Sequence, residues 1–144
     1  MSGSCRWPQF VDPNEVLFAA AEQALRRVIA EMSDDEKAKP NRTGGRFTIA
    51  ISTQERLLIY GPVKLGELTE ERDQTVSYFS MEKAMRLHLH PDHQTSRESR
   101  DEAAKQYAGA KRFGDVYILS FSGFSEEDDE KMCRYTVQEL EREA

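Results

Sequence analysis

Residues 114–130, with the sequence GDVYILSFSGFSEEDDE, carry the clearest structural pattern in the chain. The run from Val116 to Ser122 is nearly all apolar or small, which is typical of a central strand covered on both faces. Ser125, followed three residues later by Asp128, resembles a helix capping box. The stretch therefore predicts a buried strand that turns directly into a helix. The inner face of that terminal helix is expected to carry Met132, Cys133, Val137 and Leu140.

Two pairs of strands are predicted upstream of this helix. Apolar and small residues alternate over 47–52, and after a polar turn at 53–55 a second run covers 57–60. Gly61 and Pro62 are expected to end that second strand. Gly109 opens the other pair, whose turn is at 113–115 and whose second strand is the run already quoted. The spacing of both pairs predicts hairpins.

Helices are predicted on either side of the first hairpin. Asp12, Pro13 and Glu15 have the chemistry of a helix start, and apolar steps of three and four predict a helix over about 13–32. Residues 33–45 are polar and are expected to form an exposed linker. A second helix is predicted over about 74–89, and a short charged one over 99–106. The order α-β-β-α-(α)-β-β-α predicts an α+β fold, in which helices cover an antiparallel sheet of about four or five strands.

Composition limits the class of protein. The chain has 144 residues, which fits a flexible arm over 1–12 and a single domain over 13–144. Its 20 Lys and Arg against 26 Asp and Glu give a net charge of -6, and this balance argues against a nucleic-acid partner. No apolar run approaches the ~18 residues of a membrane span, and the N-terminus does not resemble a signal peptide. We therefore expect a cytoplasmic protein with no membrane partner, in which Cys5 and Cys133 stay reduced.

The three histidines lie close together in the sequence, at His88, His90 and His93, with Asp92 between them. Imidazole is a common metal ligand, and the carboxylate adds a fourth donor for zinc or iron. In one interpretation the four side chains hold a divalent metal, or one histidine supplies an axial ligand to haem iron. In the other, His88 and His90 stabilise the negative end of a helix that Pro91 terminates, and His93 is solvated.

Three segments show similarity to one protein family. Residues 50–58 match its first hairpin, and Lys83-Ala84 matches a dipeptide on the helix that follows. Residues 114–130 match its strand, turn and helix start, including an Asp-Glu ending at 129–130, although Phe124 stands where the family has a second turn glycine. The chain thus resembles the GlcG/HbpS-like, haem-degrading-domain group, which also forms the C-terminal domain of PduO-type proteins. The resemblance implies a self-associating sheet-and-helix domain, some members of which bind or degrade haem.

A cofactor site is predicted from these patterns, with Lys83, His88, His90, Ser122 and Gly123 as its residues. Lys83 is a candidate for binding a propionate or another carboxylate, although a lysine on an amphipathic helix more often extends to water. Ser122 and Gly123 offer backbone N–H groups to an anion at the start of the last helix. The predicted cofactor is haem or a divalent metal such as zinc or iron, at the mouth of a pocket between the middle helix and the sheet.

Three classes of function remain open from the sequence. The first is a small-ligand-binding or ligand-sensing domain. The second is a metal-dependent, hydrolase-like enzyme in which His and Asp ligands hold a metal that activates water. The third is a non-catalytic structural or assembly protein. A homo-oligomer is expected in addition, because the predicted helix over 74–89 is apolar over a wide arc and one small sheet does not cover it.

Overall fold

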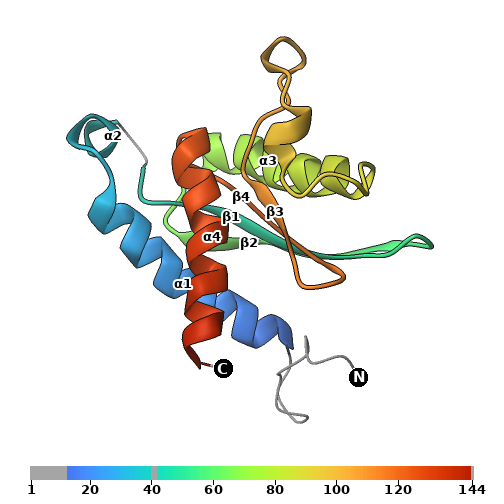
Figure 1. Ribbon diagram of the computed structural model, residues 1–144. Coiled ribbons are helices and arrows are strands. Elements are labelled where there is room, and N and C mark those ends of the chain that lie inside the picture. Colours follow the sequence, from blue (N-terminus) through green and yellow to red (C-terminus); the bar gives the residue numbers. More distant parts are fainter. Residues whose placement is uncertain (1–12, 40–41, 144) are drawn as a thin grey trace.

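The computed structural model describes residues 13–39 and 42–143. Its four strands form one antiparallel sheet in the order β2-β1-β4-β3, so that the last strand lies beside the first at the centre (Figure 1). The predicted α+β class, an antiparallel sheet covered by helices, is confirmed. The elements in chain order are α1 (Pro13–Glu31), α2 (Asp34–Ala38), β1 (Gly44–Ser52), β2 (Leu57–Gly66), α3 (Glu70–His88), the 3-10 turns η1 (Ser96–Ser99) and η2 (Glu102–Ala104), β3 (Ala110–Phe113), β4 (Tyr117–Ser122) and α4 (Glu126–Glu143).

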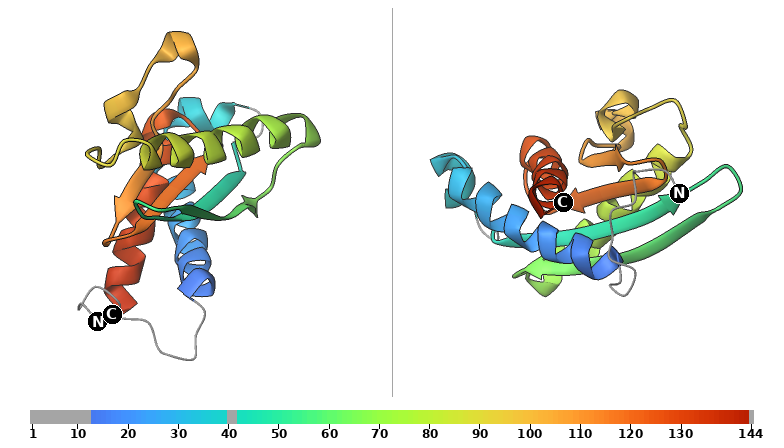
Figure 2. Two further views of the ribbon diagram at one scale, coloured as in Figure 1. Left: turned by 90° about the vertical axis from the view of Figure 1, so that its right-hand side faces the viewer. Right: turned by 60° about the horizontal axis from the view of Figure 1, so that its bottom comes forward.

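Helices cover both faces of the sheet. α1 and α4 pack together on one face, and α3 lies across the other (Figure 2). Alternation along β1 separates the two layers, because Phe47 and Ile49 belong to the core under α1 and α4, whereas Ala50 belongs to the core under α3. Both faces of the central strands are therefore buried, as predicted for the strand within residues 116–122.

Hydroxyl groups attach α3 to the sheet. The hydroxyls of Thr48 and Ser80 lie 2.8 Å apart, and the Ser120 hydroxyl donates a hydrogen bond to the backbone oxygen of Ser80 at 2.7 Å. All three residues are fully buried. Because each hydroxyl has a partner, these short side chains let the helix approach the sheet closely without leaving a buried polar group unsatisfied.

Several predicted boundaries are wrong in the first half of the chain. Residues 33–45 are not a plain linker, since they contain α2 and the start of β1 at Gly44. β2 does not end at Gly61 and Pro62 but continues to Gly66, which is possible because β2 is an edge strand and one side of it needs no ladder hydrogen bonds. α3 starts at Glu70 rather than near residue 74.

One predicted helix is absent from the described residues. The segment 99–106 holds part of η1 and the 3-10 turn η2, and η2 ends at Lys105, whose φ is +56°. The predictions for α1, for both hairpins and for the start of α4 are confirmed, and the Ser125 hydroxyl accepts a hydrogen bond from the Asp128 N–H at 3.2 Å. The predicted arm with Trp7 and Phe10, and Cys5, lie outside the described residues.

None of the helices in the described part of the chain combines the length and the apolar character needed to cross a lipid bilayer.

Candidate functional site

A cleft of about 250 Å³ lies between α3, the turn that joins β4 to α4, and Tyr107. We call it the Lys83 cleft. Its walls include Phe79 of α3, Gly123 of the turn and Asp129 of α4. Three segments that are distant in the sequence therefore meet here, at the end of the sheet where β4 passes into α4.

An ion pair between Lys83 and Asp129 lines this cleft. The Lys83 Nζ atom donates to Asp129 Oδ2 at 3.0 Å and to the backbone oxygen of Phe121 at 2.9 Å. Asp129 Oδ1 accepts a hydrogen bond from the Phe124 N–H at 2.9 Å. Lys83 and Asp129 are only 2% and 3% exposed. The pair therefore joins the α3 layer to the first turn of α4 past the end of the sheet.

The environment of Asp129 changes its protonation. Burial raises the pKa of its carboxyl to about 7, although the nearby Lys83 ammonium opposes this shift. Burial thus favours the protonated carboxyl of Asp129, while the Lys83 ammonium and the Phe124 N–H favour the ionised form. Asp129 therefore differs from the acid of an ordinary buried ion pair, because a small change in its surroundings is enough to add a proton to its carboxylate or remove one.

Helix periodicity explains why Lys83 is buried although it is charged. Lys83 falls on the same face of α3 as Ser80, Ala84 and Leu87, which contacts the sheet. The interpretation in which Lys83 extends to water is therefore wrong. Gly109 makes room for the ammonium, because a Cβ atom at Gly109 would lie 2.6 Å from Lys83 Nζ.

The rest of the cleft combines a second cation with aromatic rings. Arg72 Nη2 donates to the backbone oxygen of Gly123 at 3.0 Å, which fixes the guanidinium against the turn. The rings of Phe79 and Tyr107 meet edge to face with centroids 5.3 Å apart. The cleft therefore places two cationic side chains, one of them paired with Asp129, beside aromatic rings, an arrangement that suits a small ligand with one anionic group.

Arg86 binds the backbone at Tyr107, which lines the cleft. Its guanidinium donates to the backbone oxygens of Ser96 (2.9 Å) and Tyr107 (2.5 Å) and to the Ser99 hydroxyl (2.7 Å). Glu82 binds the same guanidinium through two further hydrogen bonds. Arg86, which is only 6% exposed, thus binds η1 and the backbone at Tyr107 to α3.

The predicted cofactor site is divided in the structure. Lys83, Ser122 and Gly123 all line the Lys83 cleft, as their prediction as one site requires. His88 and His90 do not line it, because they lie at the far end of α3. His88 Nδ1 is 2.7 Å from the Ser52 hydroxyl at the end of β1. The single pocket expected to bring the lysine and the histidines together is therefore wrong.

The histidine cluster does not form a convergent metal site. The rings of His90 and His93 stack with centroids 4.6 Å apart, while His88 faces Ser52 and Asp92 is exposed. Within the described ranges, no three His, Cys, Asp or Glu side chains come together in a way that would hold a metal ion. The arrangement corresponds to the interpretation in which His88 and His90 end the helix.

His90 nevertheless borders a larger groove. This groove, of about 710 Å³, runs along the exposed side of α3, and we call it the α3 groove. His90 Nδ1 lies 2.8 Å from the backbone oxygen of Arg86. Because a carbonyl only accepts hydrogen bonds, Nδ1 carries the proton, and Nε2 of a neutral His90 keeps its lone pair. The apolar residues along the groove are Tyr78, Met81, Met85 and Leu89.

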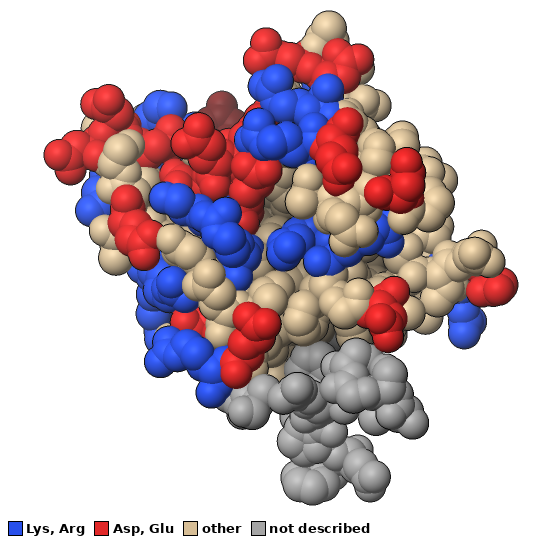
Figure 3. Space-filling model, in the orientation of Figure 1, with Lys and Arg blue, Asp and Glu red and all other residues tan. Residues whose placement is uncertain are grey.

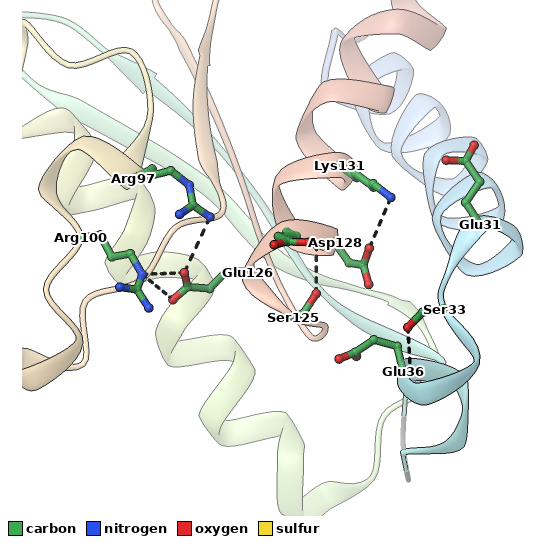
Figure 4. Close-up of a pocket in the computed structure, with 10 residues that line it drawn as sticks. Glu31, Ser33, Glu36, Arg97, Arg100, Ser125, Glu126, Asp128 and Lys131 are labelled. Atoms are coloured by element: carbon green, nitrogen blue, oxygen red, sulfur yellow. Dashed lines mark hydrogen bonds and ion pairs between the residues drawn. The ribbon is translucent and has the colours of Figure 1, made fainter.

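A third cleft, of about 610 Å³, is almost entirely charged (Figure 4). Acidic and basic side chains lie side by side over this part of the surface (Figure 3). The charges pair within the chain, since Arg100 Nε lies 2.7 Å from Glu126 Oε2 and Lys131 Nζ lies 3.9 Å from Asp128 Oδ1. We therefore regard these residues as a surface ion-pair network rather than as a ligand site.

No protein-family model, curated protein or solved structure matches this chain. The geometry above therefore carries the functional argument.

The sequence gives little indication of the roles of Asp129 and Arg72 in the Lys83 cleft. Asp129 is one of five consecutive acids, which are expected to form mainly a capped, solvated first turn, with Asp129 and Glu130 as a remote possibility for a metal ligand or general base. The signal that distinguishes it is helical phase, because Asp129 precedes the buried Met132 and Cys133 by three and four residues. Arg72 had no such signal, since its position beside the turn depends on the packing of α3 against the end of β4.

Proposed function

We propose that this chain is a small-ligand-binding domain of the GlcG/HbpS-like kind, and that its ligand binds in the Lys83 cleft. The observation that supports this most directly is the meeting of Lys83, Ser122 and Gly123 at one cleft, although they come from different segments. These three residues lie in the segments that carry the sequence resemblance. A buried ion pair at the base of a cleft adds a group with altered protonation, as is common at functional sites.

The ligand that fits this cleft is a small aromatic carboxylate. Lys83 and Arg72 provide positive charge, and Phe79 with Tyr107 provides a surface for a flat apolar ring. A cleft of about 250 Å³ is smaller than the ~300 to 1,000 Å³ of sites for drug-sized ligands. The size therefore excludes haem from the Lys83 cleft and favours a molecule of about the size of benzoate.

A cleft-filling variant provides the test. In Thr75→Tyr the new ring would occupy the cleft without changing the ion pair, because Thr75 lines the cleft on the exposed side of α3. Gln74→Tyr is the matched control, since Gln74 is its exposed neighbour and does not line the cleft. Benzoate titration monitored by 15N-1H NMR should give a Kd on the order of 1 mM for the unchanged chain and the control. Thr75→Tyr should show no saturable shifts. Equal binding by both variants would refute the site.

Haem binding at the α3 groove is a second candidate function, favoured by the geometry of His90. A histidine whose Nδ1–H is held by a backbone carbonyl presents Nε2 to a metal in a fixed orientation. The groove has a volume of about 710 Å³ and is bordered by Met81, Met85 and Leu89, which would contact a flat apolar macrocycle. Haem, when bound, would supply redox or oxygen chemistry, and His90 would hold its iron.

A haem titration tests this second candidate. A Soret band that is present in the unchanged chain and lost in His90→Ala would support it. His88→Ala is the control, because His88 is bound to Ser52 and does not border the groove. Replacing His88, His90 and His93 together by alanine is then expected to abolish the band while the melting temperature changes little. An unchanged band in His90→Ala would refute coordination by this residue.

The metal-dependent, hydrolase-like alternative finds no support in the arrangement of His88, His90, Asp92 and His93, and we do not propose it.

Self-association stays a prediction. Exposed apolar side chains lie along the α3 groove, Tyr78 and Met85 on α3 and Leu89 just after its end, and both charge signs flank them at Asp101 and Arg100. Such a surface suits a two-fold contact with a second copy. Sedimentation velocity over a concentration range, with Leu89→Gln as the variant, tests it, and a concentration-independent monomer would refute it.

A further inference from the structure

We propose that the Lys83 cleft binds its carboxylate ligand together with one proton, which Asp129 takes up when the ligand's carboxylate replaces it as the counter-ion of Lys83. The inference rests on the proposed function and adds a regulatory property to the same site. Binding would then be favoured in mildly acidic conditions and weakened in alkaline ones, so that the domain responds to the ligand and to pH together.

In the Lys83 cleft, the Asp129 carboxylate and a bound carboxylate ligand would have to share the ammonium of Lys83. Lys83 Nζ has three N–H donors, and within the described residues two of them reach Phe121 and Asp129. Both charged side chains line the cleft, so a bound carboxylate would lie within a few ångströms of Asp129. Two carboxylates that share one buried site do not both stay ionised, because like charges in a poorly solvated region repel strongly.

The other carboxylate of the cleft lining does not compete for this proton. Glu126 lines the cleft but already pairs with Arg100 at 2.7 Å, so it gains nothing from a proton. Asp129 is bound to the Lys83 ammonium, and it is therefore the carboxylate that a ligand's carboxylate would displace.

The other titratable groups near Asp129 do not take its role. Asp128 lies 3.9 Å from Lys131 on the far side of the α4 turn, and its charge opposes ionisation of Asp129. Burial raises the pKa of the Cys133 thiol to about 12, so that group stays neutral. Lys111 of β3 acts on Cys133 only from a distance. The carboxyl of Asp129, whose pKa is raised to about 7, is thus the group that accepts a proton at little cost.

The step is a simple exchange of partners. The Asp129 carboxylate releases its hydrogen bond from Lys83 and takes one proton from the solvent, and the ligand enters as the carboxylate. The Asp129 oxygen that accepts from Phe124 N–H keeps that bond, because a protonated carboxyl still has an acceptor oxygen. No covalent bond to the ligand forms, and no oxidant or reductant is needed.

Calorimetric titration of the full chain with benzoate tests the inference. Measured at pH 8 in two buffers of different ionisation enthalpy, Tris and HEPES, the heats should differ by the equivalent of close to one proton taken up per benzoate. The Kd for benzoate should be nearly constant below pH 6.5 and should rise close to tenfold between pH 7.5 and 8.5. Benzamide, which has the same shape without the charge, should show no such rise. Asp129→Asn should bind benzoate with a Kd that does not change with pH.

Each outcome decides the matter. Benzoate binding with no proton uptake and a constant Kd would overturn the coupling while leaving the proposed function intact. The same pH dependence in Asp129→Asn would overturn the assignment of the proton to Asp129. If Asp129→Asn does not fold, the proton count of the unchanged chain still decides whether the coupling exists. Failure of benzoate to bind at any pH from 5.5 to 8.5 would overturn the proposed function and the coupling with it.

Discussion

The buried ion pair gives a prediction about stability that needs no ligand. Lys83→Met removes the ammonium, and Asp129→Asn removes the carboxylate while keeping an oxygen that can accept from Phe124 N–H. Each single variant leaves one charged group without its partner in a buried position. The double variant leaves neither. The four proteins together form a double-mutant cycle that isolates the interaction between the two side chains.

The expected magnitudes follow from burial. Both side chains are at most 4% exposed, so solvent screens them little. Removing one partner of a buried pair costs about 3 to 5 kcal/mol of unfolding free energy, whereas replacing both by neutral groups of similar volume is often close to neutral. We therefore expect each single variant to lose about 3 to 5 kcal/mol at pH 8. The double variant should lose clearly less than the sum, with a coupling energy of at least about 2 kcal/mol.

The cost of Lys83→Met should also depend on pH in a defined direction. Because the pKa of Asp129 is raised from 3.8 to about 7 on folding, its contribution to stability is fully present below about pH 4 and is lost as pH rises through 7. Lys83 lowers this pKa, so without Lys83 the folded chain holds the proton to higher pH and the loss continues above 7. The unchanged chain also loses a few tenths of a kcal/mol over this range, so the cost of Lys83→Met should grow by up to about 1 kcal/mol between pH 7 and 8.

Urea unfolding followed by circular dichroism at pH 6, 7 and 8 measures these values. The range stays above pH 5.5, since carboxylates with lowered pKa values, such as those of Asp73 and Glu36, lose their contribution only in more acidic solution. Strictly additive costs in the cycle would contradict the ion pair. A cost of Lys83→Met that is equal at pH 7 and 8 would contradict the raised pKa of Asp129.

Three further substitutions test the packing around the cleft. Gly123→Val should lower the free energy of unfolding, measured in urea, by about 2 kcal/mol or more, because a Cβ atom there would lie 2.5 Å from the Gly44 oxygen. The φ of Gly123 is not positive, so this contact rather than backbone strain is the cause. Gly109→Ala should weaken benzoate binding, since its Cβ would displace the Lys83 ammonium, and unchanged NMR titrations would contradict this. Arg86→Lys should lose about 2 to 3 kcal/mol and increase amide hydrogen exchange over 95–108, because a lysine cannot reach all the partners of the guanidinium.

Local patterns in the sequence predicted most of the secondary structure. The alternation over 47–52, the start of α1 at Pro13 and the strand, turn and cap over 116–128 come from short-range signals, and the structure confirms them, while the predicted cap residue Asp12 lies outside the described residues. The wrong boundaries come from long-range causes. Pro62 lies within a strand only because that strand is at the edge of the sheet, and Gly44 lies in β1 because it pairs with Gly66 near the end of the extended β2.

For the candidate site, too, short-range signals were found from the sequence and long-range contacts were not. Lys83, Ser122 and Gly123 were found from the sequence because each belongs to a local motif, and the structure brings them to one cleft. The histidines were grouped with them because a linear pattern does not show that Lys83 lies on the buried face of α3, whereas His90 follows the end of the helix and borders the groove on its exposed side.

The sequence by itself determined the order of the elements, the α+β class and the residues of the turn before α4, because hydrophobic period, caps and glycines act over a few residues. Only the tertiary structure decided that Lys83 is buried and which acid it meets. Asp129 lies 46 residues further along the chain, and its carboxylate reaches Lys83 only because the α3 and α4 layers meet at the end of the sheet. Helical phase indicates that each side chain lies on an inward face, but no local pattern shows which charged group lies opposite it, because that depends on the element packed against the helix.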